Sequence, residues 1–244
     1  MVFSTKGIVL RTVPYGETSV IVSCYTQSFG LQSYIVNGVR TGKKANFKAN
    51  HLQPASILEM EVYHNDLKNL QRIKEAKWHY LYTRVFFNVY KNAVALFITE
   101  LLQKTLRQPE ANPELYEFIE DTYITLDKSD EKTVANLPLY FAIHLTSFFG
   151  AKIQDNHVRS TDLLDLQEGS FTQNAPLHPY YTSPRVAAII AHLLKIMQPV
   201  ELHDLVLNKF ERRETLETLI QFYSLHIHDF GSMKSLTVLQ EVLA

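Results

Sequence analysis

The chain has 244 residues, with 24 Lys and Arg against 25 Asp and Glu, so its formal net charge is −1. Hydrophobic residues make up 46% and charged residues 20%, close to the average of globular proteins, which excludes a disordered charged tail and a collagen-like repeat. The neutral sum hides an uneven distribution: residues 1–80 carry ten basic and five acidic side chains, which leaves 14 basic and 20 acidic side chains in residues 81–244. We therefore expect two domains of opposite charge.

The cysteine content and the charge pattern limit the class of protein further. Cys24 is the only cysteine, so one chain can form neither a disulfide nor a cysteine-based zinc site, and we expect a buried thiol. Lys6 and Arg11 interrupt the apolar start of the chain, so we predict no secretory signal. Residues 133–151 carry no charge but include several polar side chains, which indicates a buried helix rather than a membrane span. We expect a cytoplasmic protein without a membrane segment.

Residues 2–77 have the pattern of β-strands. We predict five strands, of which the last is the weakest, at residues 7–13, 18–26, 31–39, 58–62 and 70–74. Apolar and charged residues alternate in the fourth of these, which is typical of a sheet with one solvated face. Five short strands with a longer connection after the third fit a small closed barrel such as the OB-fold. We therefore predict an N-terminal five-stranded OB-fold barrel over residues 1–78.

From residue 79 onwards apolar residues recur at helical spacing, so we predict an all-helical domain over residues 79–244. The helices are expected at residues 79–106 (as one helix or a pair), from 113 onwards, over 133–150, from 184 onwards and over 211–225. Asn112 and Ser183, each followed by proline, are typical helix caps. The polar stretch 151–182 is predicted to be an insertion with a short hairpin at 163–171. The fold class is therefore α+β.

No motif for catalysis, for a metal or for a small-molecule cofactor is found in the sequence. Gly38–Lys44 resembles a phosphate-binding loop, but three residues instead of four separate its glycines, and Lys44 stands where the motif needs serine or threonine. His226 and His228 would share a face only on a strand, and no cysteine or acidic run completes a tetrahedral set, so solvated histidines are favoured. We predict that the protein is not an enzyme and has no cofactor, no metal and no small-molecule substrate.

One segment of the predicted barrel is strongly basic. No acidic residue lies between Glu17 and Glu59, and nine consecutive positions hold four cations and one aromatic ring: Arg40, Lys43, Lys44, Phe47 and Lys48. Cations that follow a phosphate backbone, together with aromatic faces that stack on bases, are the combination that single-stranded nucleic acids need. We predict a nucleic-acid-binding site here, with Lys6 and Arg11 as outlying contributors. The alternative is a solvated loop between two strands, with the aromatic residues of the barrel in its core.

A series of segments matches a known family in order and spacing. The segments are Thr5–Leu10, Tyr15–Val22, Gly30, the basic stretch Gly38–Lys48 with Leu52–Pro54, Leu58–Tyr63 and, more loosely, Lys234–Leu239. Together they resemble the bacterial RecO recombination mediator family. The resemblance implies an N-terminal OB-fold and a C-terminal helical domain, the same division that the residue pattern places near residue 78.

The resemblance also implies a non-enzymatic role in the recombinational repair of gapped DNA. RecO proteins bind single- and double-stranded DNA and anneal complementary strands. With their partner RecR they help to load the RecA recombinase onto strands coated with single-stranded-DNA-binding protein (SSB), and RecF is a further candidate partner. The resemblance places the contact with the SSB tail in the helical domain. A protein with this role is expected in the cytoplasm, at the nucleoid.

Under this interpretation the cations of the basic segment grip DNA phosphates: they are Arg40, Lys43, Lys44 and Lys48, with Lys6 and Arg11 further out. No base-specific readout is expected, because stacking and phosphate contacts are largely indifferent to sequence. Two other interpretations stay open. The chain could be a non-catalytic protein adaptor whose basic loop meets an acidic partner surface, or an RNA-binding OB module.

One departure from the family concerns zinc. Many members carry a four-cysteine zinc module in the helical domain, and the corresponding residues 151–182 contain no cysteine here. His157 and His178 alone cannot supply the array of thiolate or imidazole ligands that zinc needs. We therefore expect no structural zinc, with the predicted hairpin at 163–171 in its place.

Overall fold

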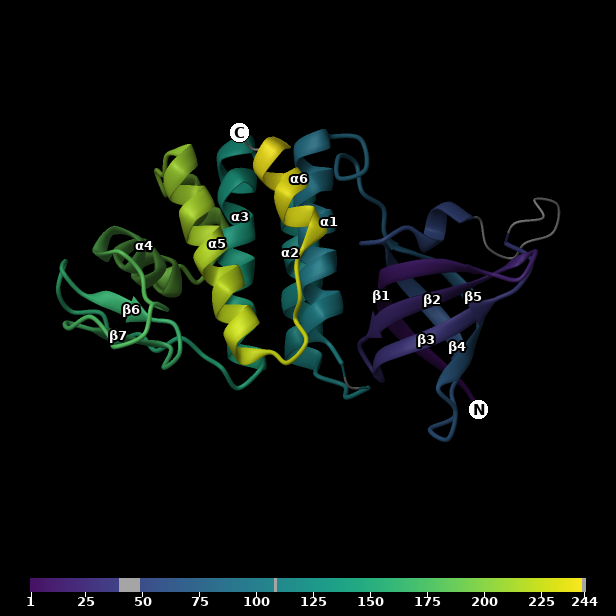
Figure 1. Ribbon diagram of the computed structural model, residues 1–244. Coiled ribbons are helices and arrows are strands. Elements are labelled where there is room, and N and C mark those ends of the chain that lie inside the picture. Colours follow the sequence, from purple (N-terminus) through teal and green to yellow (C-terminus); the bar gives the residue numbers. More distant parts are fainter. Residues whose placement is uncertain (40–48, 108, 243–244) are drawn as a thin grey trace. The chain divides into compact units, whose positions relative to one another are not determined.

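The computed structural model describes residues 1–39, 49–107 and 109–242 (Figure 1). The chain folds into two compact units, one made of Met1–Phe87 and Leu102–Asp127 and the other of Asn88–Leu101 and Lys128–Ala244. The structure thus groups residues 102–127 with the barrel, whereas a single division after residue 78 would place them in the helical domain. The helix α1 (Val89–Thr105) contributes to both units.

The first unit contains a closed five-stranded barrel, as predicted. Its strands are β1 (Val2–Tyr15), β2 (Ser19–Thr26), β3 (Gly30–Val36), β4 (Ile57–Tyr63) and β5 (Leu70–Tyr80). They follow one another around the barrel in the order β1-β2-β3-β5-β4, and all neighbours are antiparallel except β3 and β5, which are parallel. A short 3₁₀ helix, η1 (Ala49–Leu52), precedes β4. β5 continues well beyond its predicted end at residue 74.

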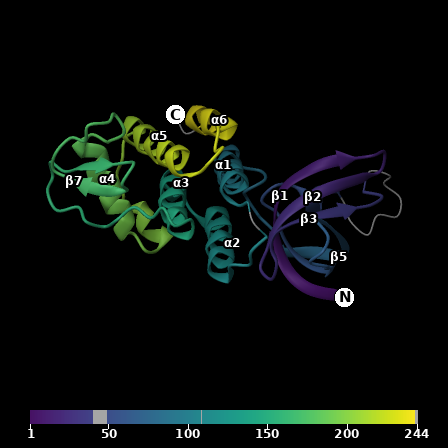
Figure 2. The ribbon, with the colours of Figure 1, turned by 60° about the horizontal axis from the view of Figure 1, so that its bottom comes forward.

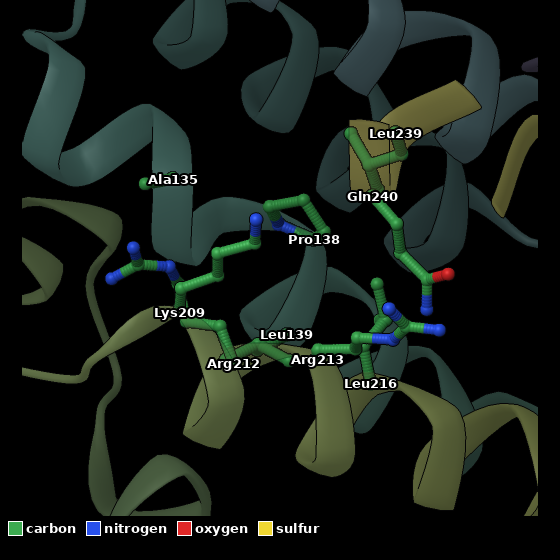
Figure 3. A pocket seen from close by; sticks show the side chains of 9 residues that line it. All are labelled: Ala135, Pro138, Leu139, Lys209, Arg212, Arg213, Leu216, Leu239 and Gln240. Carbon is green, nitrogen blue, oxygen red and sulfur yellow. The ribbon is translucent and has the colours of Figure 1, made fainter. Parts of the chain in front are cut away.

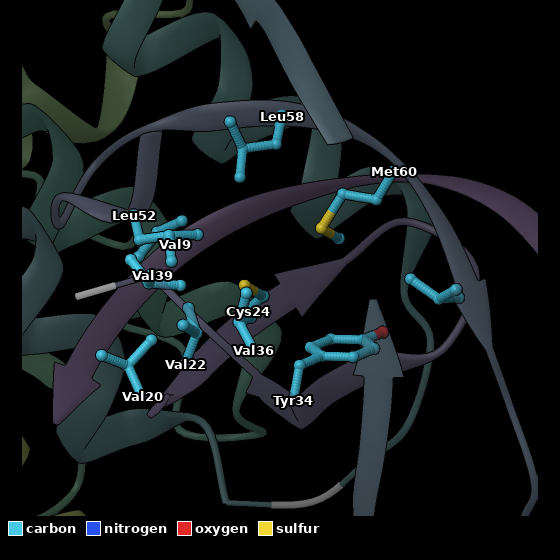
Figure 4. Packing of buried hydrophobic residues seen from close by; sticks show 11 residues of the cluster. Val9, Val20, Val22, Cys24, Tyr34, Val36, Val39, Leu52, Leu58 and Met60 are labelled. Carbon is cyan, nitrogen blue, oxygen red and sulfur yellow. The ribbon is translucent and has the colours of Figure 1, made fainter. Parts of the chain in front are cut away.

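The interior of the barrel is filled by side chains that alternate along the strands (Figure 4). The buried members include Val9, Val22, Cys24, Tyr34, Leu58, Met60 and Val62. Cys24 is fully buried, and this burial raises the pKa of its thiol to about 12, so the thiol stays protonated and packs as a small apolar side chain. The expected burial of Cys24 is confirmed.

One side of the barrel is covered by α2 (Pro113–Lys128). The ring of Tyr25 on β2 stacks on Tyr116 of α2 with 6.3 Å between the ring centroids, and both side chains are buried. At the β2–β3 turn Gly30 has a φ of +61°, and a Cβ built on it would lie 2.2 Å from the carbonyl oxygen of Glu110. Only glycine allows both this turn and this close approach. The β2–β3 hairpin therefore fits directly against the chain that leads into α2.

The second unit is helical. After α1 its helices are α3 (Glu131–Leu145), α4 (Pro184–Lys195), α5 (Lys209–His226) and α6 (Lys234–Val242), with the 3₁₀ helices η2 (Thr146–Phe148) and η3 (Pro199–His203). Of these, α3, α4 and α5 begin within two residues of the predicted positions. The side chain of Ser183 caps α4 by accepting a hydrogen bond from the backbone N–H of Val186. From Thr133 onwards α3 is buried along nearly its whole length and packs on α4 and α5, which explains why residues 133–145 carry no charge.

The first predicted helix is wrong at its beginning. Residues 79–88 are not part of a long helix: His79 and Tyr80 end β5, and a turn then leads to α1, whose first residue is Val89. The apolar side chains that suggested a helix serve the barrel unit instead, since Tyr82 and Val85 are buried there. Apolar content without a clear period does not distinguish a helix from a buried irregular segment.

Residues 151–182 contain the predicted hairpin, formed by β6 (Leu163–Asp165) and β7 (Ser170–Thr172) next to α4 (Figure 2). One carboxylate oxygen of Asp165 accepts hydrogen bonds from the backbone N–H groups of Gln167 and Glu168. These bonds hold the turn between the two strands. The hairpin is therefore organised by side-chain hydrogen bonds to its own backbone.

The histidines considered as metal ligands have other neighbours. His226 ends α5, and its Nε2 lies 2.8 Å from the carbonyl oxygen of Leu166, whereas His228 Nε2 lies 3.1 Å from Asp229. Within residues 1–39, 49–107 and 109–242, no three His, Cys, Asp or Glu side chains are grouped so as to hold a metal ion. The same residues include no helix with the length and apolar character needed to cross a membrane.

A buried carboxylate fastens α2 to the end of the barrel. Asp127, in the last turn of α2, accepts hydrogen bonds of 2.8–3.2 Å from the backbone N–H groups of Thr83, Arg84 and Val85 and from the hydroxyls of Thr83 and Tyr80. Burial alone would raise the pKa of this carboxyl group, but the hydrogen-bond donors, above all the three backbone N–H groups, outweigh it and lower the pKa. Asp127 therefore stabilises the chain between β5 and α1 while it is ionised.

We expect Asp127→Asn to lower the free energy of unfolding at pH 7 by about 2–4 kcal/mol, because the amide turns an NH₂ group towards buried donors that then lack an acceptor. Since folding lowers the pKa of Asp127, its contribution is present above the ordinary carboxyl pKa of about 3.9 and is lost as the pH falls through the folded-state pKa. Urea unfolding at pH 7 and in acid should show a difference between variant and wild type that shrinks in acid. A variant as stable as wild type at pH 7 would contradict this role.

Candidate nucleic-acid interface

The predicted basic segment lies outside the described residues; this applies to Arg40, Lys43, Lys44, Phe47 and Lys48. The described chain on either side of it is anchored in the barrel core. Val39 before it and Leu52 after it are both buried and belong to the same core cluster as Val36, the last residue of β3. The basic segment is therefore attached to the barrel where β3 ends.

Lys6 lies on the side of the barrel that α2 covers. Its ammonium group forms an ion pair with Glu120 Oε2 at 2.5 Å and lies 5.3 Å from the centre of the Tyr116 ring. The side chain of Glu120 is only 9% exposed, and its other oxygen lies 3.3 Å from His79 Nε2. Breaking such a pair would leave a buried carboxylate without its partner. The positive charge of Lys6 is thus engaged within the protein.

Arg11 lies on the same strand as Lys6 but beyond a β-bulge, and it is exposed. It pairs with Ser23 on β2, which in turn pairs with Ser33 on β3. The next outward-facing row, from β1 to β5, is Val13, Ile21, Ile35 and Arg72. Residues paired across neighbouring strands point to the same side, so the two rows form one surface. We call this surface, made of Arg11, Val13, Ile21, Ser23, Ser33, Ile35 and Arg72, the open barrel face.

The open barrel face is cationic. Arg11 and Arg72 are both exposed, and neither forms an ion pair with another residue in the part of the chain that the structure describes. By contrast Lys74, two residues after Arg72 on β5, pairs with Glu61 at 2.6 Å. The other members of the face are serines and aliphatic side chains, so they bring no carboxylate against the two guanidinium groups. Because guanidinium groups match phosphate oxygens in geometry and charge, this face can bind the backbone of a nucleic acid.

Most aromatic residues of the barrel serve its packing, which agrees with the alternative interpretation for these rings. Tyr25 and Tyr34 are buried, and the ring of Phe29 stacks on His64 with 4.0 Å between the centroids. Tyr15 differs, because it follows Val13 on the same side of β1 and is 52% exposed. An exposed ring next to cations is suited to stacking on unpaired bases. Tyr15 therefore extends the open barrel face with an aromatic contact.

Sequence reasoning overlooks Arg72. The alternation within residues 70–74 does carry a signal, since the preceding Gln71 is buried and points inward, which leaves Arg72 outward. The parallel pairing of β3 with β5, which brings Arg72 beside Ile35 and onto the same surface as Arg11, has no counterpart in the sequence. The charge is therefore visible in the sequence, but its neighbours are not.

The second unit holds a pocket between α3, α5 and α6 (Figure 3). It is lined by Ala135, Pro138, Leu139, Lys209, Arg212, Arg213, Leu216, Leu239 and Gln240. Aliphatic side chains predominate, three cations come from the first turns of α5, and no carboxylate is among the described residues that line it. Such a pocket fits an apolar group carried on a negatively charged segment.

The sequence does not predict this pocket, because three basic and three acidic residues follow one another closely at the start of α5 and cancel in sum. The structure shows that two of its carboxylates are already paired: Glu211 caps the start of α5 and pairs with Arg185, and Glu217 lies 3.0 Å from Nε of the pocket residue Arg213. The aliphatic lining comes from α3 and from the consecutive helices α5 and α6, which follow much later in the chain. Only their packing brings the cations and the apolar surface together.

Comparison with known proteins agrees with a barrel in the N-terminal part of the chain and helices in the C-terminal part. The model of the N-terminal region of recombination protein O matches residues 1–82, and that of its C-terminal region matches residues 87–236. The chain is 33% identical to the DNA repair protein RecO of Phocaeicola vulgatus over 100% of both chains, and 33% identical to that of Bacteroides fragilis over 99% of both. It is 30% identical to the DNA repair protein RecO of Flavobacterium johnsoniae over 100% of both chains. From its barrel to its helices, this chain belongs to the RecO family of DNA repair proteins.

Proposed function

We propose that this protein is a recombination mediator that binds single- and double-stranded DNA, anneals complementary strands and, with RecR, helps to load RecA onto SSB-coated strands. Membership of the RecO family supports a role in DNA repair and recombination. The observation that carries the DNA-binding part is the open barrel face, where Arg11 and Arg72 have no ion-pair partner among the described residues. RecF is a further candidate partner, and chromosomal DNA as the ligand implies work in the cytoplasm, at the nucleoid. The role requires holding strands and partners and no chemical step.

In the proposed complex the phosphate backbone runs across the open barrel face. Arg11 and Arg72 bind phosphate oxygens, and the hydroxyls of Ser23 and Ser33 lie between them as neutral donors. The basic segment, attached where β3 ends, adds Arg40, Lys43, Lys44 and Lys48 to the phosphate contacts and Phe47 to the stacking contacts. Lys6 has a lesser part, because its charge is already paired with Glu120. Binding of this kind is independent of base sequence.

Annealing follows from the same surface. Two single strands repel each other through their phosphates, and this repulsion falls when protein cations take the place of condensed counter-ions. Residues 1–80, with ten basic and five acidic side chains, supply such cations. A surface that holds phosphates and stacks on base faces leaves the pairing edges of the bases available to a second strand.

For the SSB contact we propose the pocket between α3, α5 and α6. Its apolar lining accommodates a hydrophobic side chain, and Lys209 and Arg212, which form no ion pair among the described residues, oppose the negative charge of a tail segment. The domain around the pocket is acidic and by itself repels an acidic segment. These cations therefore form a local site of positive charge on it. Separate sites for DNA and for SSB would let the protein hold the coated strand and its coat at the same time.

Two other functions make different predictions for the same surfaces. A protein adaptor would bind an acidic partner through the barrel and would not bind a short DNA oligonucleotide in a salt-dependent manner. An RNA-binding module would prefer RNA to DNA of the same sequence. Titration of the full chain with a DNA oligonucleotide at several salt concentrations, followed by competition with RNA, separates the three. A strand-annealing assay with SSB present tests the mediator role itself.

The double variant Lys43→Glu/Lys44→Glu should weaken binding to all DNA sequences alike, because these residues are proposed to contact phosphates. If three or four cations of the basic segment each neutralise one phosphate, log K of the wild type falls with log salt concentration with a slope of about −2 to −3 for single strands. The slope of the variant should be flatter. Fluorescence anisotropy with a labelled oligonucleotide measures both quantities. An unchanged affinity and slope would show that the basic segment is not part of the DNA-binding site.

Arg72→Gln should weaken binding of single-stranded DNA and flatten the salt slope by about 0.7, the effect of one phosphate contact. Lys74→Gln is the matched control, because it removes the same charge from the same strand, but from an ammonium group already paired with Glu61. Arg11→Gln should behave like Arg72→Gln. Equal effects of the Arg72 and Lys74 variants would show that net charge, and not the open barrel face, governs binding.

Lys209→Glu should weaken binding of a peptide with the sequence of the SSB C-terminal tail by about fivefold at low salt, because it reverses a charge at the edge of the pocket. Lys195→Glu, at the end of α4 and outside the pocket lining, makes the same charge change as a control. Binding of DNA by either variant should match wild type. If both variants bind the peptide equally well, the tail docks elsewhere.

A further inference from the structure

The wall of the pocket that α6 contributes is held less firmly than the others. α6 has nine residues, and among them Leu239 is the buried one. An isolated helix of this length is marginal in water, so α6 depends on its contacts with the rest of the unit. The chain before it is well anchored: Phe230 and Met233 are buried, and the ring of Phe230 stacks on Tyr223 with 5.7 Å between the centroids. Undocking of α6 about this fixed point would therefore expose little buried apolar surface.

The first turn of α6 is held by a carboxylate from another helix. Glu100 on α1 accepts hydrogen bonds from the backbone N–H of Lys234 at 3.0 Å and from that of Ser235 at 2.7 Å. The first N–H groups of a helix have no acceptor within the helix, and the positive end of the helix dipole lies at the same place. Glu100 therefore acts as a cap supplied from outside α6. It does not line the pocket.

The far end of α6 is part of the pocket itself. Leu239 and Gln240 belong to the lining, as Figure 3 shows. Gln240 Nε2 donates a hydrogen bond to Glu217 Oε1 at 2.9 Å, and the same oxygen lies 3.0 Å from Arg213 Nε. The position of α6 thus determines one apolar wall of the pocket. It also determines the contact of Gln240 with Glu217, the carboxylate that orients Arg213.

We propose that α6 is a strap that docks on the occupied pocket: docking of α6 and binding of an acidic peptide with an apolar anchor strengthen each other, and Glu100 positions the strap. This inference rests on the proposed docking of the SSB tail. A ligand that contacts Leu239 binds the docked state of α6 more tightly than the undocked state and so shifts the population towards docking. The coupling is reciprocal. Undocking of α6 must therefore lower the affinity for the peptide by the same factor by which bound peptide disfavours undocking.

Glu100→Lys is the strongest test variant, because it removes the cap and places a cation at the positive end of the helix dipole. Glu100→Gln is the milder one, since its amide is uncharged and accepts through a single oxygen. Amide exchange in residues 236–242 of the full chain should be faster in both variants, and more so in Glu100→Lys. The Kd for the SSB tail peptide should rise in inverse proportion to the docked fraction of α6, by about threefold or more for Glu100→Lys.

The direction of the effect separates the strap from simple electrostatics. Each Glu100 variant makes the unit less negative, which by itself favours an acidic peptide. Glu214→Lys and Glu214→Gln on α5 make the same charge changes outside the pocket lining, so they should bind the peptide as tightly as wild type or more tightly. In wild type, saturating peptide should slow amide exchange in α6 specifically.

Unchanged or tighter peptide binding by Glu100→Lys would overturn the strap, as would α6 exchange that neither the variant accelerates nor the peptide slows. Failure of the strap alone would appear as peptide binding that responds to Lys209→Glu but not to Glu100→Lys. If wild type does not bind the peptide at all, the proposed docking of the SSB tail is wrong, and the strap proposal, which rests on it, is wrong as well.

Discussion

Parallel pairing between β3 and β5 closes the barrel, and the arrangement of the candidate DNA-binding residues depends on it. Without this pairing the strands would form an open sheet with two edges to protect. With it, the outward side chains of β1, β2, β3 and β5 form one continuous surface, on which Arg11 and Arg72 occupy neighbouring rows. α2 takes up the adjoining part of the barrel through Tyr25 and Lys6, so the open barrel face is the part that α2 leaves exposed.

The pairing of individual charges matters more than their sum. At physiological ionic strength a charge acts over a distance of about 8 Å, so a cation is available to a ligand only when no carboxylate lies close to it. Lys6 and Lys74 each form an ion pair, whereas Arg11 and Arg72 form none within the described residues. In the acidic helical unit, Glu211 pairs with Arg185 and Glu217 pairs with the pocket residue Arg213, which leaves Lys209 and Arg212 as pocket cations without an ion pair among the described residues.

Elements defined by local chemistry could be predicted closely. The five strands, the hairpin within residues 151–182 and the cap at Ser183 all follow from the alternation of residues or from turn and cap side chains within a few positions. The prediction of a helix over residues 79–88 is wrong, because their apolar side chains fill a core whose shape is set by distant strands. The grouping of α2 with the barrel likewise depends on contacts such as those of Asp127 with the turn after β5.

The sequence by itself determined the order of barrel and helices, the membership in the RecO family and the concentration of positive charge at Arg40–Lys48, since each is a property of neighbouring residues or of their order. Only the tertiary structure decided that Lys6 is neutralised, that Arg72 joins Arg11, and that three helices enclose a cationic, apolar pocket. The physical reason is that ion pairing, exposure and shape depend on distances between residues remote in the chain, and no local pattern specifies those distances.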